Sequence, residues 1–361
     1  MSPIQKIIFG SPGTGKSYEA RKIAEEELDI KYEQENRIIE TVFHPEYTYS
    51  DFVGKLLPYT YGNSVVYKYY PGHFLKALGK AYKSLIDGRD DNYLLIIDEL
   101  NRGNAAAIFG SMFQLLDRKD NGWSSYRIDI SEMELIGLLQ AMRYKVDILT
   151  DGSIQIDGSR LDKILETKEK ELNNFNALEV VKNLKNHQIS IPVNLSIIAT
   201  INTSDESIYY LDTAFKRRWD WHYINMPNTD VSSSEVPKLV WYTKLSVTED
   251  KQLEWCSCIL GINRFIRNHH LTIRRIEDKE IGWWFIKPNS NNIIQLQTIK
   301  DKLMFYLWDN VFARDKKPLE HLVEKLSNKK IDLITFADFV KYTPQIMEYM
   351  EKLGDNEIIP F

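Results

Sequence analysis

Residues 10–17 read GSPGTGKS and directly follow the apolar run Ile7–Phe9. They match the pattern G-x-x-x-x-G-K-[ST] at every position, in the strand-then-helix context expected of a phosphate-binding loop. Glycines allow the chain to turn through unusual backbone angles, so that successive N–H groups face the phosphates before a helix begins. We therefore predict that this loop binds a nucleoside triphosphate. The alternative, a chance glycine-rich turn, is disfavoured by this context. The expected binding residues are Gly10, Pro12, Gly13, Thr14, Gly15, Lys16 and Ser17.

Two side chains of the loop have distinct expected roles. Lys16 places a positive charge on the outer phosphates, and the Ser17 hydroxyl is an expected ligand of Mg2+. The substrate is then a magnesium complex of ATP or GTP.

A second motif lies further along, where the apolar run Tyr93–Ile97 ends in Asp98 and Glu99. Such a run predicts a buried parallel strand, and ligands of such sheets bind outside the carboxyl ends of the strands. We expect this strand to neighbour that of the loop, so that both motifs meet one nucleotide. Asp98 then holds Mg2+, through water, and Glu99 polarises the attacking water. The simpler alternative, an acidic helix start, is disfavoured by the pairing with the loop.

Three more candidates follow the next apolar strand, Ser196–Thr200. Asn202 comes directly after it, where a neutral amide can orient the attacking water or touch the outermost phosphate; alternatively, it only turns a loop. Arg217 and Arg218 lie at an expected helix end, where cations can simply complement the helix dipole. The sharper hypothesis is an arginine finger that reaches a neighbouring subunit's triphosphate, which requires an oligomer.

Composition bounds the class of protein. With 361 residues, 43% of them apolar and 27% charged, the chain can form one sizeable α/β core and a smaller domain. A net charge of −5 argues against a nucleic-acid footprint over the whole surface. We see neither a signal peptide nor a membrane span and expect a cytoplasmic protein. Cys256 and Cys258 have no further cysteines with which to build a metal site, so we interpret them as packing residues.

The pattern along the chain predicts a nucleotide-binding core over residues 1–230, with an insertion at about 123–190, and a mainly helical C-terminal domain over residues 231–361. Within the core we expect a helix through Lys22–Glu25, a strand over Ile38–Phe43 and a short helix capped by Ser50 or Asp51. A tyrosine-rich hairpin is expected over Tyr59–Tyr70, with its turn at Gly62-Asn63. Two further helices are expected, one from Gly72 and one over Ile108–Leu116. In the C-terminal domain, Trp241, Trp255, Phe265 and Ile266 indicate apolar helix faces, and Leu303–Phe312 another amphipathic helix.

The order of these motifs resembles the AAA+ ATPases, and in detail the McrB-type branch, the nucleotide-driven motors of modification-dependent restriction systems. The resemblance covers residues 4–225 except the insertion, with a weaker echo at Ile281–Phe285. Its segments are FHPEYTYSDF at 43–52, IDELNRGN at 97–104, TINTSD at 200–205 and LDTAFKRRW at 211–219.

The resemblance implies an AAA+ P-loop core, in which helices flank a parallel sheet, followed by a smaller helical lid. It implies that residues 10–17 are Walker A, Asp98 and Glu99 Walker B, and Asn202 sensor 1. It further implies a homo-oligomer, with six subunits in a ring, that hydrolyses nucleotide at subunit interfaces. The resemblance also implies that hydrolysis drives a partner nuclease of the McrC type and that this chain contacts DNA indirectly.

The sequence departs from the family in two places. The family's guanine-nucleotide signature has an arginine where this chain has Glu206. A glutamate repels a triphosphate, so base preference stays open, with ATP slightly favoured as the commoner superfamily substrate. McrB-type proteins often carry an N-terminal domain that recognises DNA, whereas the first expected strand here starts at Ile4. We therefore expect target recognition from the insertion, the C-terminal part or a separate protein. The competing hypothesis is a protein-remodelling ATPase of the MoxR or dynein-related type that acts on a client polypeptide.

Overall fold

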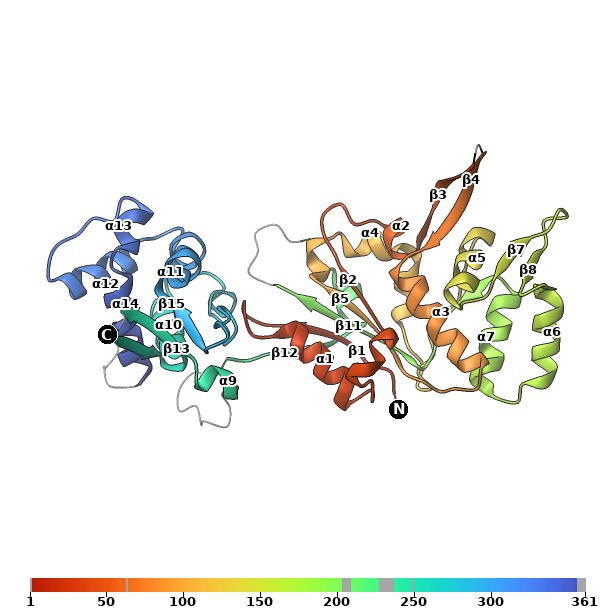
Figure 1. Ribbon diagram of the computed structural model, residues 1–361, viewed down its shortest axis with the longest axis horizontal. Coiled ribbons are helices and arrows are strands. Elements are labelled where there is room, and N and C mark those ends of the chain that lie inside the picture. The colour runs from red at the N-terminus through yellow and green to blue at the C-terminus, as the bar shows by residue number, and fades with distance from the viewer. Residues whose placement is uncertain (1, 63, 203–208, 227–236, 249, 356–361) are drawn as a thin grey trace. The chain divides into compact units, whose positions relative to one another are not determined.

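The computed structural model describes residues 2–62, 64–202, 209–226, 237–248 and 250–355. Within this part the chain forms two compact units. The first is built from residues 2–8, 17–201 and 209–222, and the second from residues 9–16, 202, 223–226, 237–248 and 250–355. Each unit has its own helices and strands (Figure 1) and its own buried core.

A five-stranded sheet forms the centre of the first unit. Its order is β12 (Asp220–Tyr223), β1 (Gln5–Phe9), β11 (Leu195–Ile201), β5 (Tyr93–Asp98) and β2 (Ile38–Val42). β5 pairs in parallel with β11 and with β2, and all seven residues of β11 are buried. This continuous burial is typical of parallel strands covered on both faces. The strands of the phosphate loop and of Asp98 are not neighbours, however, because β11 lies between them.

Helices cover this sheet. The helices outside the insertion are α1 (Lys16–Glu26), η1 (Tyr32–Arg37), α2 (Tyr49–Phe52), α3 (His73–Ile86), η2 (Leu100–Arg102), α4 (Ala105–Phe109), η3 (Gly110–Leu116) and α8 (Thr213–Lys216). α3 packs on β5 and β2 and buries the expected apolar face, Phe74, Leu75, Leu78 and Tyr82. The parallel sheet flanked by helices is thus confirmed.

Two local details differ from the sequence-based expectation. The N-cap of α2 is Thr48, whose N–H and hydroxyl both donate to Asp51 Oδ2, at 3.0 and 2.7 Å. Asp51 is therefore the third residue of a capping box and does not cap the helix. The helix expected over residues 108–116 is split at Gly110, where φ is +51°, into α4 and the 3-10 helix η3.

The tyrosine-rich hairpin is confirmed. Its strands are β3 (Gly54–Tyr61) and β4 (Ser64–Pro71), and Tyr61 pairs with Ser64 across the turn at Gly62. Figure 1 shows the hairpin projecting away from the sheet of this unit. Its apolar side chains are largely exposed, with Val65 at 62% and Tyr67 at 69%.

The insertion forms a small layer of its own beside α3. Its elements are β6 (Ile128–Asp129), α5 (Glu132–Ala141), β7 (Val146–Ile148), β8 (Ile154–Ile156), β9 (Ser159–Arg160), α6 (Leu161–Glu171), α7 (Phe175–Lys185) and β10 (Gln188–Ile189). α5 and α7 both pack against α3, and Figure 1 shows α5, α6 and α7 gathered at one end of this unit.

Arg118 joins the start of the insertion to its end. Its guanidinium donates to the carbonyl oxygens of Gly122 at 2.9 Å, Ile191 at 3.1 Å and Leu195 at 2.8 Å. Desolvation lowers the pKa of this guanidinium to about 9, because these partners are neutral and no carboxylate of the described residues forms an ion pair with it.

We expect Arg118→Met to lower the free energy of unfolding by about 3 kcal/mol, because it leaves several carbonyl groups without a donor. Denaturant unfolding measures this loss. Arg160→Met, at an exposed position in the insertion, is the control; equal stabilities of the two variants would contradict the proposed junction.

The second unit contains a helical core and a small sheet that we did not predict. Its elements are α9 (Lys238–Trp241), β13 (Lys244–Thr248), β14 (Lys251–Glu254), α10 (Trp255–Asn268), η4 (Ile276–Asp278), β15 (Ile293–Gln295), α11 (Leu296–Thr298), the π-helical segments η5 (Ile299–Met304) and η6 (Leu307–Val311), α12 (Lys317–Ser327), α13 (Phe336–Val340) and α14 (Thr343–Gly354). The strands pair in the order β14-β13-β15.

Glycines bring α10 and α14 close together. A Cβ atom at Gly261 would overlap the Met350 carbonyl, and one at Gly354 would overlap that of Ser257.

Trp255, Phe265 and Ile266 are buried on α10 as expected, whereas Trp241 is 42% exposed. Cys256 and Cys258 are buried on α10 too, and burial raises the pKa of the Cys256 thiol to about 11. Among the described residues, no helix is both long and apolar enough to cross a membrane.

Candidate nucleotide-binding site

The phosphate loop has the backbone geometry that its sequence requires. Gly13 and Gly15 have φ values of +79° and +88°, which a side chain would strain. α1 begins directly after them at Lys16, whose ammonium donates to the carbonyl oxygens of Gly10 at 2.8 Å and Ser11 at 3.3 Å. The Thr14 hydroxyl donates to Ser11 O at 2.9 Å and closes the turn.

The loop belongs to the second unit, where it packs against the segment Ile281–Phe285. The N–H groups of Gly282 and Trp284 donate to the carbonyl oxygens of Pro12 and Gly13, at 2.7 and 2.8 Å. A Cβ atom at Gly282 would overlap the Gly13 carbonyl, so this approach needs glycine. The contact uses carbonyl groups of the loop, whereas phosphates are bound by N–H groups.

The acidic pair lies at the carboxyl end of β5, where the first turn of α1 meets it. Ser17 Oγ lies 3.4 Å from Asp98 Oδ1. The Thr200 hydroxyl on β11 donates to the same Asp98 oxygen at 3.0 Å and accepts the Glu99 N–H at 3.2 Å. Thr200 therefore positions both acids.

Glu99 turns out of the strand through an uncommon backbone conformation. Its φ and ψ are 55° and 43°, in the left-handed region. For a residue with a Cβ this costs roughly 1–2 kcal/mol, and such strain is concentrated at functional sites. Glu99 caps η2, whose Arg102 N–H donates to Glu99 O at 2.8 Å.

The donor set fits Mg2+. Hydroxyl and carboxylate oxygens are the hard ligands that this ion takes, usually together with water and substrate phosphates. Ser17 Oγ and Asp98 Oδ1 lie 3.4 Å apart and would hold one such ion together, Asp98 through water. When bound, the ion would neutralise phosphate charge.

Asn202 immediately follows β11, the strand between β1 and β5. It thus leaves the sheet at the edge where Asp98 ends β5. The next residues, 203–208, lie outside the described part of the chain, so the departure at Glu206 has no structural counterpart.

The two arginine candidates have different surroundings. Arg218 is held within its own chain, and its side chain is only 8% exposed. Its Nη2 and Nε donate to Asp117 Oδ2 at 2.6 and 3.0 Å, and its Nη1 donates to Ala214 O. Its guanidinium also stacks over Phe113. Arg217 is exposed, and no ion pair of its guanidinium occurs within the described ranges. This difference favours Arg217 for a contact outside its own chain.

Comparison with known proteins identifies the family. The chain is 30% identical over 339 residues to the Type II restriction enzyme BsuMI component YdiS of Bacillus subtilis (strain 168), covering 87% of this chain and 80% of that protein. The chain belongs to the McrB-type AAA+ ATPases. Residues 5–142 of this McrB-type ATPase match the AAA domain of the dynein-related subfamily.

A second relative is the Type IV methyl-directed restriction enzyme EcoKMcrB subunit of Escherichia coli (strain K12). It is 31% identical over 120 residues, which is 33% of this McrB-type ATPase and 24% of that protein. The protein is accordingly a nucleoside triphosphate hydrolase with an AAA+ core.

Replacing Thr200 tests the arrangement of the acids. We expect Thr200→Val to lower the hydrolysis rate by about 10- to 100-fold and to raise the Mg2+ concentration required, because it removes the hydroxyl that orients Asp98 and Glu99. Ser196→Ala is the control: its hydroxyl lies on the same strand and bonds the Ile4 N–H instead. A Mg2+ titration of steady-state hydrolysis gives the result, and a Thr200→Val enzyme with wild-type rates would refute the role.

Proposed function

We propose that this McrB-type ATPase assembles head to tail into a six-membered ring, hydrolyses nucleotide at its subunit interfaces and thereby drives a partner nuclease on DNA in restriction or phage defence. Each composite site takes its phosphate loop, acids and Asn202 from one chain and Arg217 from the next.

The observation that carries the proposal is the Ser17, Asp98, Thr200 and Glu99 constellation. The loop N–H groups and Lys16 bind the phosphates, and Ser17 and Asp98 hold Mg2+. Glu99 accepts a proton from the attacking water as general base, while Asn202 orients that water. Apart from Glu99, these residues serve positioning and charge stabilisation, which dominate phosphoryl transfer.

In this proposal, Arg217 supplies a positive charge to the nucleotide site of the neighbouring subunit. Charge on the transferred phosphoryl group builds up in the transition state, and an arginine from a neighbouring subunit stabilises it there. Arg217 lies at the end of α8, is exposed and forms no ion pair with a carboxylate of the described residues. A ring gives every Arg217 a neighbouring site.

The relatives support the restriction role. Both are named as parts of restriction enzymes, and the match to the BsuMI component extends over most of both chains. A motor of this kind needs a separate nuclease, for which we propose a partner of the McrC type, with DNA reached through that partner. The reaction takes place in the cytoplasm, where DNA and nucleotide are both present.

A second candidate function is protein remodelling. The family match is to the dynein-related subfamily, and the exposed apolar hairpin β3–β4 would suit contact with a client polypeptide.

Hydrolysis of ATP and of GTP, each measured with and without DNA, distinguishes these functions, together with the mass of the assembled particle. We expect a six-subunit mass with nucleotide and stimulation by DNA plus the nuclease. Stimulation by a protein client and no response to DNA with nuclease would favour remodelling. A monomer with full activity would overturn the shared site.

A further inference from the structure

A cavity of about 350 Å3 opens in the first unit at the amino ends of β2 and β5. Its walls come from η1, α3, the segment leading to β5 and the turn after α5, and they carry the cations Arg37, Lys80, Lys83, Arg89 and Arg143. Tyr93 begins β5, whereas Asp98 ends it. The cavity therefore lies at the opposite edge of the sheet from the Asp98 site, and its volume suits a small ligand.

The lining of this cavity is strongly positive. Five of its residues are cations and only two, Glu33 and Asp91, are acidic. One more carboxylate, Asp87, pairs with two of the cations from just outside. Counting all three acids, two positive charges remain uncompensated in a chain whose net charge is −5.

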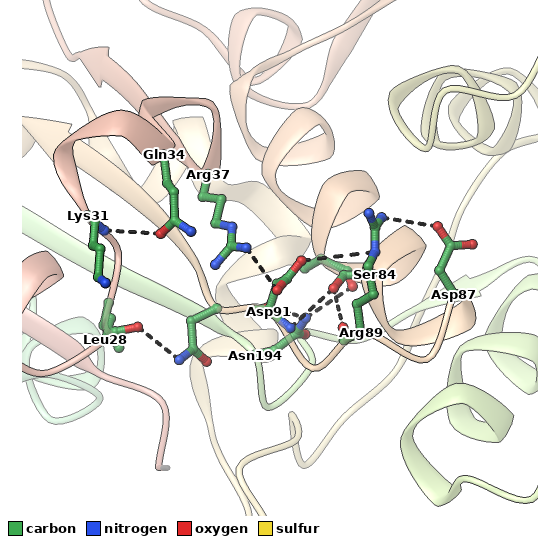
Figure 2. A network of polar contacts seen from close by, with 11 residues as sticks. Leu28, Lys31, Gln34, Arg37, Ser84, Asp87, Arg89, Asp91 and Asn194 are labelled. Carbon is green, nitrogen blue, oxygen red and sulfur yellow. Dashed lines mark hydrogen bonds and ion pairs between the residues drawn. The ribbon is translucent and has the colours of Figure 1, made fainter.

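Three of the cations are fixed by Asp87 and Asp91, as Figure 2 shows in part. Arg37 bonds Asp91 at 2.9 Å, Arg89 bonds Asp87 at 3.1 Å, and Lys83 bonds Asp87 at 2.5 Å. Asp91 is itself held through its backbone, since its N–H donates to Ser84 Oγ at 3.3 Å and its carbonyl accepts from Asn194 at 3.0 Å. This side of the cavity is preorganised.

Lys80 and Arg143 are the two cations without such a partner. Within the described ranges neither forms an ion pair, and the Lys80 ammonium donates only to a backbone carbonyl, that of Asn36, at 2.6 Å. The pKa of Lys80 is lowered, first by burial and then by the positive charges of Arg143 and Lys76. A bound anion would remove this repulsion.

Arg143 is placed at the wall by an uncommon backbone conformation. Its φ is +65°, where asparagine or glycine would be less strained. A cation after the end of α5 also complements the helix dipole. That effect does not account for Lys80, which lies in the middle of α3.

We propose that this cavity is a second anion site, which binds a phosphate group between Lys80 and Arg143. A phosphate monoester carries a charge of about −1.5 to −2 at pH 7 and offers three acceptor oxygens. It therefore matches the two uncompensated cations in charge and accepts hydrogen bonds from both ammonium and guanidinium groups. The group belongs either to a small phosphorylated molecule or to the backbone of DNA.

The test uses the full chain with Lys16→Ala, which weakens phosphate binding at the loop. Inorganic pyrophosphate is titrated by calorimetry, and a short fluorescent DNA duplex by anisotropy at several salt concentrations. In this background, Lys80→Gln with Arg143→Asn removes both charges, and asparagine tolerates the positive φ. Lys170→Gln removes one charge from an exposed position of α6 and is the control.

We expect the double substitution to weaken one probe by at least about tenfold, with an unchanged melting temperature, while the control binds normally. Loss of pyrophosphate binding identifies a small phosphorylated ligand. Loss of DNA binding with a smaller salt dependence identifies the DNA backbone. The proposal is wrong if neither probe binds the parent, or if the double variant binds both as the parent does.

Discussion

Glu99→Gln will bind nucleotide with nearly the affinity of the wild-type chain and will hydrolyse it about 10^2 to 10^4 times more slowly. Glutamine keeps the size of the side chain but cannot accept the proton of the attacking water. The loop, Ser17 and Asp98 are unchanged, so the phosphates and Mg2+ keep their ligands. Binding is measured with a fluorescent nucleotide, and turnover by phosphate release.

The control for this prediction is Lys16→Ala, which should lose binding and turnover together. If Glu99→Gln turned over at the wild-type rate, the general base would have to be another residue. If it lost binding instead, Glu99 would act through the structure of the site, whose left-handed backbone it occupies.

Arg217→Ala will lower hydrolysis by about 10^3 to 10^5 in an assembled particle, the range known for arginine fingers. Mixing it with Lys16→Ala subunits should restore part of the activity. In the mixed ring, some sites combine the intact loop of an Arg217→Ala subunit with the Arg217 of a Lys16→Ala neighbour. Rescue on mixing, followed by phosphate release, is evidence for action between subunits.

Arg218→Ala provides the matched control. It removes charge-assisted bonds to Asp117 and should therefore lower the free energy of unfolding by about 1.5–3 kcal/mol. Its residual hydrolysis should not be rescued by Lys16→Ala subunits. The opposite pattern, with Arg217→Ala fully active and Arg218→Ala rescued by mixing, would reverse the assignment.

Local motifs explain why much of the candidate site was predictable. The loop is one continuous segment, residues 10–17, and the two acids Asp98 and Glu99 are neighbours in sequence. An apolar run precedes each motif, and this run predicts the strand that positions it. Because parallel strands end at the same edge of a sheet, we expected Ser17 and Asp98 to lie together. Ser17 Oγ lies 3.4 Å from Asp98 Oδ1. The cap of α2 was predicted wrongly, because Thr48 and not Ser50 or Asp51 is its N-cap.

Other features depend on contacts distant in sequence. Thr200 lies in the TINTSD segment, but we predicted no role for it, because that role arises from the pairing of β11 with β5. That pairing also places β11 between β1 and β5, an order that no local pattern encodes. Likewise, Arg217 and Arg218 differ because Asp117, far away in the chain, binds only the second. The strands of the insertion are two or three residues long, too short to show a period.

A structure of the assembled particle with Mg2+ and a non-hydrolysable triphosphate tests the central claim most directly. The account predicts one triphosphate that contacts Lys16, a metal ion beside Ser17 and Asp98, and Arg217 from the adjacent subunit. A structure in which Lys16 and Asp98 lie too far apart to serve the same bound nucleotide would contradict it.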